Sequence, residues 1–408
     1  MMILNENQQL VVDKAVEWFY NSSSKLFQFD GPAGTGKSVV LNAIINALGL
    51  SREEVLSMAY TGQACTVMRK KGLIDACTCH SGLFTPVLVQ MKDENGRTVI
   101  NEKFNTPVMK WEFIPKNFEN TNIKLIVLDE SWMIPRRFRS VIENTGIKVI
   151  AAGDSGQLPP VGDDPGYLVD GKIYHLTQFM RQSGDSPILY LANRARQGLK
   201  IEPGNYGKNV QVIFEDELDK NIMAYNTVLC AKNKTRDIIN RYIRESIFRF
   251  GEFPNTGEKI ICRKNDWSLE VDGISLVNGL VGHISSPVDI GRYSGDTIKI
   301  DFQPDMINKP FRDIYINYRY LKGSVQERET LKRNPYLDGE LFEYAYASTV
   351  HLSQGSEYSS GIYIEEYFRQ DMQNALNYTA ITRFKEGLLY VKKRPKWYYK
   401  NGGVKYGN

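Results

Sequence analysis

Residues 31–38 bring three glycines, a lysine and a hydroxyl side chain together at fixed spacing. The segment matches the phosphate-binding pattern G-x-x-x-x-G-K-[ST] at every specified position, as Gly31-Pro32-Ala33-Gly34-Thr35-Gly36-Lys37-Ser38. Glycines let the backbone turn tightly, so that several N–H groups point at phosphate oxygens. Lys37 can reach the β- and γ-phosphates of a nucleotide, and Ser38 can ligate Mg²⁺. The pattern therefore predicts that these eight residues bind a nucleoside triphosphate with Mg²⁺.

Two further groups with the chemistry for phosphoryl transfer follow apolar runs. Asp129 and Glu130 come directly after Leu125–Leu128. A buried strand explains the apolar run, but not two adjacent acids at its end, which need a partner or a metal ion. Asp129 fits an outer or water-mediated ligand of Mg²⁺, and Glu130 fits the base that orients an attacking water. Gln157, before the prolines of a later turn, can sense the γ-phosphate and couple it to movement.

The elements that must position these groups alternate between apolar strands and helical stretches. In residues 1–175 the strand candidates are 26–29, 55–60, 123–128 and 148–152. Each ends near polar or glycine-bearing residues, which predicts a parallel α/β sheet with its ligands at the carboxyl ends of the strands. A second α/β unit is indicated by strand candidates at 228–231, 361–364 and 388–391 and by a helix at 234–250.

Two stretches interrupt this alternation. Residues 84–120 are polar and aromatic without clear helical periodicity. Residues 265–340 are rich in turns and short β-like segments, with strand-like alternation in 297–302. Both are interpreted as insertions, the second as a small β-barrel-like module of the SH3 or OB kind. The predicted domains are 1–175, then 176–264 with 341–408, and the inserted module 265–340.

Bulk composition is that of an ordinary soluble globular protein. The chain has 408 residues, of which 42% are hydrophobic and 24% charged, enough for two or three domains. There is no apolar run of about 18 residues and no secretory pattern, so neither a membrane span nor export is expected. Five scattered cysteines fit free thiols in a reducing cytosol. The net charge of +4 neither demands nor excludes nucleic acid as a partner.

Taken together, the phosphate loop, Asp129-Glu130 and Gly153-Asp154-x-x-Gln157-Leu-Pro-Pro resemble the motifs of superfamily 1 helicases. Further blocks occur in the family's order between residues 4 and 391. They are Leu4-x-x-x-Gln8, Ala59-Tyr-Thr61-Gly62-Gln-Ala64, Thr78-Cys-His80-Ser81, Leu176-Thr177-x-x-x-Arg181-Gln182, Ala347 to Glu357, and Leu376 to Arg383. The string Thr-x-His-x-Ser-Gln-Gly-Ser-Glu at 349–357 is the most specific, and it is similar to the B-type, RecD-like and Dda-like branch.

This resemblance implies two RecA-like parallel-sheet domains with ATP and Mg²⁺ in the cleft between them. Arg181 and Arg383 would act on the nucleotide from across the cleft, while the first domain would contribute Lys37, Ser38, Asp129, Glu130 and Gln157. Planar arginine donors stabilise the charge that phosphoryl transfer spreads over the equatorial oxygens. Because they reach the nucleotide only when the cleft closes, hydrolysis would be tied to domain motion. Gln8 would read the adenine, and Glu357 would contact the ribose or its neighbourhood.

The same resemblance implies a phosphate-backbone grip on each domain. The candidates on the first domain are Thr61, Gly62, His80 and Ser81. The candidates on the second are Asn233, Thr235, Thr349 and His351. Hydroxyls, amides and backbone N–H groups bind phosphate without reading sequence. The alternatives stay open, since the histidines also fit structural roles and Thr or Ser at strand ends often caps helices.

Aromatic residues in the first insertion suggest a strand-separating wedge or pin, which the family places at the duplex fork. The candidates are Phe84, Phe104, Trp111 and Phe113. Stacking one base on an aromatic ring contributes about 1–3 kcal/mol, against a cost of about 1.4 kcal/mol for opening one base-pair step. Packing of the insertion's own small core is the alternative for most of these four residues.

The expected protein is an ATP-dependent DNA helicase that moves 5′ to 3′ on single strands and unwinds duplex, in DNA replication, recombination or repair. The family branch alone supplies the polarity. Expected partners are single-stranded and forked DNA, with single-stranded-DNA-binding or replisome proteins as further candidates. A monomer in the cytoplasm, or in the host cytoplasm if phage-encoded, is expected, with no membrane contact.

Two alternatives to this function remain open. The first is an RNA helicase, or a nucleic-acid-stimulated ATPase and translocase that does not unwind. The second is an ATP-switched DNA-binding mediator of recombination or replication. Glu130, Arg181 and Arg383 argue against the second, since a switch needs fewer hydrolytic parts.

Overall fold

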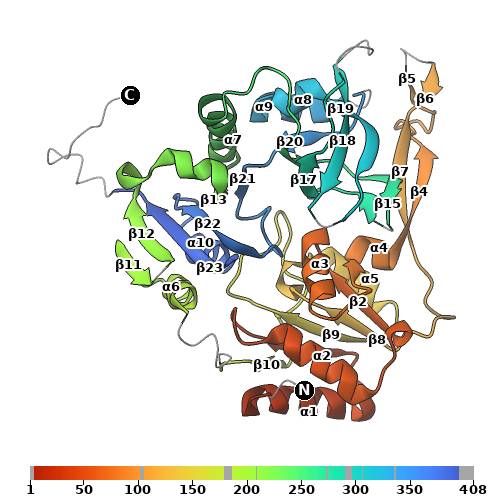
Figure 1. The fold of residues 1–408 in the computed structure, drawn as a ribbon. Helices are drawn as coiled ribbons and strands as arrows, with labels where there is room; N and C mark the ends of the chain where they lie inside the picture. Colours follow the sequence, from red (N-terminus) through yellow and green to blue (C-terminus); the bar gives the residue numbers. More distant parts are fainter. Residues whose placement is uncertain are drawn as a thin grey trace. The chain divides into compact units, whose positions relative to one another are not determined.

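The computed structural model describes residues 4–101, 105–178, 186–207, 209–272, 274–289, 296–305, 307–334 and 337–394. The chain divides into two compact units (Figure 1). The first unit comprises Met1–Cys79, Phe118–Arg236 and Ala347–Asn408. The second comprises His80–Asn117 and Asp237–Tyr346. No helix among the described residues is long and apolar enough to cross a membrane.

A parallel sheet of six described strands carries the first set of predicted site residues (Figure 1). In the order β10-β1-β9-β8-β2-β3, the strands are Ile173–His175, Leu26–Asp30, Lys148–Gly153, Leu125–Leu128, Val55–Ala59 and Cys77–Thr78. The main helices of this part are α1 (Glu6–Asn21), α2 (Lys37–Leu48), α3 (Gly62–Lys70) and α5 (Arg136–Glu143). Residues of α1 and α2 share a buried core with strands β1, β8 and β9. The parallel α/β sheet predicted from the apolar runs is confirmed.

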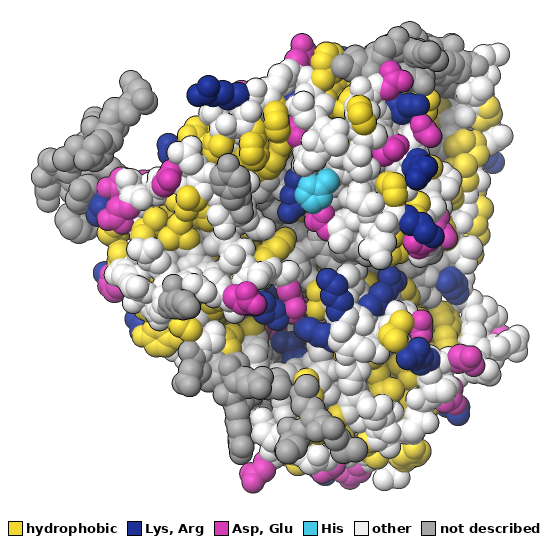
Figure 2. All heavy atoms as spheres, in the orientation of Figure 1, with side chains coloured by type: hydrophobic (Ala, Val, Ile, Leu, Met, Phe, Trp, Pro, Cys, Tyr) yellow, Lys and Arg dark blue, Asp and Glu magenta, His cyan; other side chains and the backbone are white. Residues whose placement is uncertain are grey.

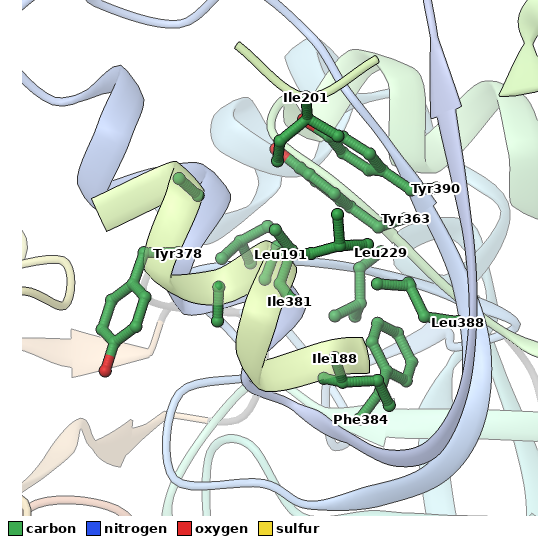
Figure 3. Packing of buried hydrophobic residues seen from close by; sticks show 14 of the residues in the cluster. Ile188, Leu191, Ile201, Leu229, Tyr363, Tyr378, Ile381, Phe384, Leu388 and Tyr390 are labelled. Atoms are coloured by element: carbon green, nitrogen blue, oxygen red, sulfur yellow. The ribbon is translucent and has the colours of Figure 1, made fainter. Parts of the chain in front are cut away.

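A second sheet lies in the same compact unit. In the order β11-β12-β23-β22-β13-β21, its strands are Gly204–Gly207, Val210–Phe214, Phe384–Lys392, Tyr358–Ile364, Thr227–Cys230 and Ala347–Thr349. All neighbours are parallel except β11 and β12, which are antiparallel. Helices α6 (Pro187–Arg196) and α10 (Gln373–Ile381) pack on it through a core that includes Leu191, Ile381 and Leu388 (Figure 3). The helix predicted at 234–250 is α7 (Asn233–Tyr242), followed by a π-helical turn at Ile243–Ile247.

The second unit is built from antiparallel strands. Its described sheet has the order β19-β18-β17-β14-β20, formed by Phe311–Asn317, Thr297–Pro304, Val281–Ile284, Lys259–Cys262 and Phe342–Tyr344. A bridge between Ile316 and Glu340 joins the end of β19 to the chain before β20, and the barrel-like form of this module stays a prediction. The smaller elements are the β15–β16 hairpin (Asp266–Val271, Ile274–Leu276), α8 (Tyr318–Lys322) and α9 (Val325–Lys332). The alternation predicted at 297–302 is confirmed, because buried and partly buried side chains alternate along β18.

The first insertion forms a hairpin in the second unit. Strand β4 (Phe84–Gln90) pairs antiparallel with β7 (Met109–Pro115), and short strands β5 (Ile100–Asn101) and β6 (Thr106–Pro107) extend it. Neither long strand has a fully buried residue. Without a buried face the sequence shows no clear period, which explains why no strand was predicted here.

The structure groups the predicted domains differently. Both parallel sheets belong to one compact unit, and the β-rich sheet extends beyond 265–340 at both ends through β14 and β20. Because compact units need not coincide with domains, the predicted limits 1–175, 176–264 with 341–408, and 265–340 stay a prediction.

Candidate active site

The phosphate loop lies between the end of β1 and the start of α2. Gly34 and Gly36 have φ angles of +86° and +81°, in the left-handed region that side chains disfavour. A Cβ added to Gly31 would lie 2.6 Å from the Thr35 Oγ1 and 2.9 Å from the Leu176 Cβ. Of the two glycines that the pattern specifies, Gly36 is thus required by backbone conformation and Gly31 by close packing, and Gly34 between them is also required by its backbone conformation.

Lys37, Ser38 and Asp129 are brought together beside this loop. Lys37 Nζ donates to the Gly31 carbonyl at 2.8 Å, and the Ser38 hydroxyl donates to Asp129 Oδ2 at 3.4 Å. Burial, with the nearby charge of Glu130, raises the pKa of the Asp129 carboxyl despite the opposing charge of Lys37. The described residues contain no cluster of three His, Cys, Asp or Glu side chains that could hold a metal. One hydroxyl and one carboxylate nevertheless fit Mg²⁺, which takes few protein ligands when phosphates supply others.

Gln157 links the candidate base to the candidate arginine finger. Its Nε2 lies 3.4 Å from Glu130 Oε2, and its Oε1 accepts a hydrogen bond from Arg383 Nη2 at 3.1 Å. Glu130 follows β8 with a left-handed φ of +49°, and its N–H donates to Asp129 Oδ1 at 2.9 Å. An amide carries both a donor and an acceptor, so Gln157 can serve a carboxylate and a guanidinium at the same time.

A cavity of about 1170 Å³ contains these groups within the first unit. Residues of the first sheet's side that line it include Lys37, Ser38, Asp129, Glu130 and Gln157. Residues of the second sheet's side include Gly355, Glu357, Thr382, Arg383 and Lys385. Lys37 and Arg383 therefore face one shared cleft. Arg181, the second arginine expected there, lies outside the described residues.

Glu357 lies at this cleft between two lysines. Its carboxylate pairs with Lys71 Nζ at 2.9 Å and with Lys385 Nζ at 3.0 Å. Burial opposes ionisation of Glu357, but the two lysines outweigh it and hold the pKa of the carboxyl below its ordinary value. The contact that the family resemblance assigns to the ribose stays a prediction.

Gln8 supports the phosphate loop directly. Its Nε2 donates to the Thr35 carbonyl at 2.9 Å, and its Oε1 accepts from the Asn5 N–H at 3.0 Å. The second contact belongs to the capping box that begins α1. Leu4 and Gln9, rather than Gln8, line the cavity. Adenine recognition by Gln8 stays a prediction.

Six of the eight candidates for DNA contact belong to the first unit, and several already have structural contacts there. Thr61 caps α3 by accepting from the Ala64 N–H at 3.2 Å, and Gly62 is the first residue of that helix. A Cβ on Gly355 would lie 2.7 Å from Thr61 Oγ1, so the two motif blocks are in contact. Asn233 begins α7, and the hydroxyl of Thr235 donates to Glu366 at 2.6 Å.

Thr349 and His351, at and after the end of strand β21 in the second sheet, also already have structural contacts. The buried Thr349 hydroxyl accepts from the Leu352 N–H at 3.3 Å. The ring of His351 packs 5.5 Å from that of Phe368, and burial lowers the pKa of the imidazole. Roles in DNA binding for these residues stay predictions.

The other two candidates, His80 and Ser81, belong to the second unit. The His80 ring lies 5.8 Å from that of Phe113, and the Ser81 carbonyl accepts from Lys116 Nζ at 2.7 Å. Phe113 also packs edge-on against Trp267, with ring centroids 5.8 Å apart, yet remains 38% exposed. Among the four aromatic candidates, Phe84 and Trp111 are only partly buried, and Phe104 lies outside the described residues. Phe113 is thus both packed and exposed, and a role as a wedge stays a prediction.

Sequence reasoning missed Tyr378, Asp154 and Lys71 as site residues. Tyr378 and Asp154 are 224 residues apart and share a hydrogen bond, and Lys71 and Glu357 are 286 apart. Asp154 lies in the motif block that ends in Gln157-Leu-Pro-Pro, and Tyr378 lies in the block from Leu376 to Arg383, and this placement is the sequence signal that could have indicated them. Their pairing follows no local spacing, so only the fold reveals it.

Fold and site together define a phosphate-loop nucleotide-binding protein with RecA-like sheets. Residues 4–210, just over half of the chain, match the AAA domain family AAA_30, and the chain belongs to this family. The resemblance to superfamily 1 helicases of the RecD-like branch is confirmed by similarity to curated and solved members.

Three of these similar proteins show how much of the chain is matched and at what sequence identity. The ATP-dependent RecD2 DNA helicase of Deinococcus radiodurans is 23% identical over 432 residues, covering 97% of this chain and 50% of that protein. The ATP-dependent DNA helicase PIF1 of Saccharomyces cerevisiae is 29% identical over 197 residues, covering 42% and 21%. The Pif1 helicase from Bacteroides, crystallised with ADP-AlF3 and ssDNA, superposes with a TM-score of 0.53 at 17% identity, over 99% of both chains. The chain spans about half, or less, of the length of these curated relatives.

Proposed function

We propose that this chain is an ATP-dependent DNA helicase that translocates 5′ to 3′ on single-stranded DNA. The observation that carries the proposal is the shared cleft, in which Lys37, Glu130 and Gln157 face Arg383 from the second sheet. A nucleotide held by residues of both sheets makes its hydrolysis depend on their approach. The similar RecD2 and PIF1 proteins are DNA helicases, which supports DNA as the substrate.

The chain's own residues divide the chemistry of hydrolysis. Loop amides of residues 31–38 and Lys37 would bind the phosphates, and Glu130, with Gln157, would orient the attacking water. Arg383 would stabilise the charge that develops on the transferred phosphoryl group. Ser38 and Asp129 would hold Mg²⁺, which neutralises charge on the phosphate oxygens when bound.

The DNA contacts would rest mainly on neutral groups. Lys and Arg side chains are interspersed with acidic and uncharged ones on the face in view (Figure 2). This fits the net charge of +4 and a grip by hydroxyls, amides and backbone N–H groups. The β4–β7 hairpin, with the exposed ring of Phe113, is the candidate for strand separation at a fork. A monomer in the cytoplasm is part of the proposal.

Substrate and polarity can be tested in one series. We expect single-stranded DNA to stimulate ATP turnover more strongly than RNA of the same sequence. Of two partial duplexes with opposite single-stranded tails, the protein should unwind the one with the 5′ tail. Lys37→Ala should abolish both activities without changing the thermal unfolding profile, because Lys37 contacts the loop rather than the core.

Each alternative gives a different outcome. Preferred stimulation by RNA would indicate an RNA helicase, and ATP turnover without strand separation would indicate a translocase. Slow, DNA-independent hydrolysis with tight nucleotide-gated DNA binding would indicate an ATP-switched mediator. Unwinding of only the 3′-tailed duplex would contradict the proposed polarity.

A further inference from the structure

Tyr378 belongs to the core of the second sheet but directs its hydroxyl out of that core. The side chain is 1% exposed and is a member of the cluster that packs α6 and α10 on the sheet. Figure 3 shows its ring at the edge of the cluster, with the hydroxyl pointing away from the other labelled residues. Phenylalanine would fill the same space, so packing alone does not explain a tyrosine here.

Both partners of this hydroxyl come from the first sheet's side. It accepts a hydrogen bond from the Ala33 N–H of the phosphate loop at 2.8 Å. It donates to Oδ2 of Asp154, the residue that follows strand β9. The hydroxyl therefore ties helix α10 to the loop and to the end of a strand in the other sheet.

Asp154 is fully buried and connects onward to Gln157. It accepts from the Gly156 N–H at 3.1 Å and lies 3.4 Å from Gln157 Nε2. Burial raises the pKa of the Asp154 carboxyl, while Lys37 and the Tyr378 hydroxyl oppose that rise. An acceptor buried this deeply is costly unless its hydrogen bonds are made, so the Tyr378 contact matters for its placement.

The hydrogen bonds close into a ring through Arg383. Gln157 accepts from Arg383 Nη2 at 3.1 Å, and Arg383 Nε donates to the Thr379 carbonyl at 3.1 Å. Thr379 is the neighbour of Tyr378 on α10. The guanidinium is thus held on one side by the carbonyls of Thr379 and Ser356, and on the other by Gln157, whose position depends on Asp154.

Resting on the proposed ATP hydrolysis, we propose that Tyr378 is a positioning residue that sets Gln157 and Arg383 against the phosphate loop. Its hydroxyl joins loop, buried carboxylate and helix into one hydrogen-bonded unit. Loss of the hydroxyl leaves Arg383 in the cleft but releases the frame that orients it. Turnover, more than nucleotide affinity, then depends on Tyr378.

The test compares two buried tyrosines of the same cluster. Tyr378→Phe removes the bridging hydroxyl, and the control Tyr363→Phe removes a hydroxyl that donates to Asn377 at 2.7 Å. In Tyr378→Phe we expect kcat to fall about 10- to 100-fold, as for loss of a hydrogen bond to a charged group. KM for ATP should stay within about twofold. Tyr363→Phe should change neither value.

A second measurement needs no nucleotide. In the nucleotide-free protein, site-resolved hydrogen exchange of the Ala33 amide should be faster in Tyr378→Phe and unchanged in Tyr363→Phe. Equal Ala33 exchange in wild type and Tyr378→Phe, or an unchanged kcat, overturns the positioning role. Absence of ATP turnover in the wild type overturns the proposed function instead, and the exchange result still reports the contact.

A second variant tests the same positioning role in case Tyr378→Phe does not fold. Asp154→Asn keeps an oxygen that can accept from Tyr378, so the Ala33 amide should stay protected. It should nevertheless reproduce the fall in kcat, because the amide nitrogen that replaces Oδ1 cannot accept from the Gly156 N–H, and a neutral amide oxygen holds Gln157 Nε2 less strongly than a carboxylate does. A normal kcat in Asp154→Asn overturns the proposal.

Discussion

Glu130 shows how chemistry at the scale of one residue depends on its neighbours. It stands after a buried strand in a left-handed conformation, with φ of +49°, which non-glycine residues rarely adopt. Its carboxylate lies 3.4 Å from the Gln157 amide and lines the same cavity as Lys37. Such strain persists where surrounding contacts enforce it, and it is frequent at functional sites.

Replacing Glu130 by Gln tests its assignment as the base. The amide keeps the shape and the Gln157 contact, but it cannot take a proton. We expect kcat for ATP hydrolysis to fall about 10²- to 10⁴-fold, with the dissociation constant of ATP nearly unchanged. Glu143→Gln, an exposed partner of Arg139 on α5, is the matched control and should leave kcat unchanged. Near-normal turnover in Glu130→Gln would contradict the assignment.

At the scale of elements, helix α1 is tied down at both ends. At its start, Asn5 and Gln8 form a capping box, and Gln8 also bonds the phosphate loop. Its last turn contains no basic residue of its own. Lys148 of β9 supplies that charge, since its Nζ donates to the carbonyls of Trp18, Phe19 and Ser22 at 3.1, 2.6 and 2.9 Å.

Lys148→Met should therefore destabilise the protein. Methionine keeps most of the apolar stem but leaves the three carbonyls without this donor. We expect a loss of about 1–2 kcal/mol, measured as a lower urea midpoint. The control is Lys14→Met on the same helix, whose exposed pair with Glu17 should contribute little. Equal midpoints for the two variants would contradict the capping role.

At the scale of the whole molecule, polar contacts join the two sheets of the first unit. The Leu158 N–H donates to the Thr379 hydroxyl at 2.9 Å, and the Leu158 carbonyl accepts from Gln354 Nε2 at 2.8 Å. Lys71, at the end of α3, pairs with Glu357. Hydrogen bonds and ion pairs exchange with water at small net cost, so the movement of the two sheets under the proposed function would break these contacts at small cost.

Glu357→Gln should reveal the ionic part of this connection through its pH dependence. The folded-state pKa of Glu357 lies below its ordinary value of 4.5, so the stabilisation is present above about pH 4.5. It is lost as the pH falls through the folded-state pKa. At pH 7 the variant should be less stable by about 0.5 kcal/mol, and the difference should shrink toward zero at low pH.

The measurement is the urea midpoint of both proteins at pH 7 and near pH 3. Glu143→Gln provides a matched comparison outside the cleft. A difference between wild type and Glu357→Gln that persists or grows in acid would show that the ion pair is not its source.

Sequence patterns predicted the buried elements well and the exposed ones poorly. The runs at 26–29 and 148–152 form strands β1 and β9, because a parallel strand is buried on both faces and therefore needs a continuous apolar segment. The β4–β7 hairpin was missed, because its side chains lack a buried face that would impose a period. The same holds for the candidate site. Lys37 and Glu130 stand at the ends of elements that the apolar runs predict, whereas the role of Tyr378 depends on contacts with residues far away in the sequence.

The amino-acid order by itself determined the phosphate loop and the two carboxylates after β8. The glycine conformations of the loop and the start of the following helix depend on immediate neighbours, and the two acids are adjacent in the chain. Only the tertiary structure decided that Tyr378 reaches Ala33 and Asp154, and that Lys71 meets Glu357. These pairs lie hundreds of residues apart, and no sequence period connects them; the packing of two separate sheets around one cleft brings them into contact.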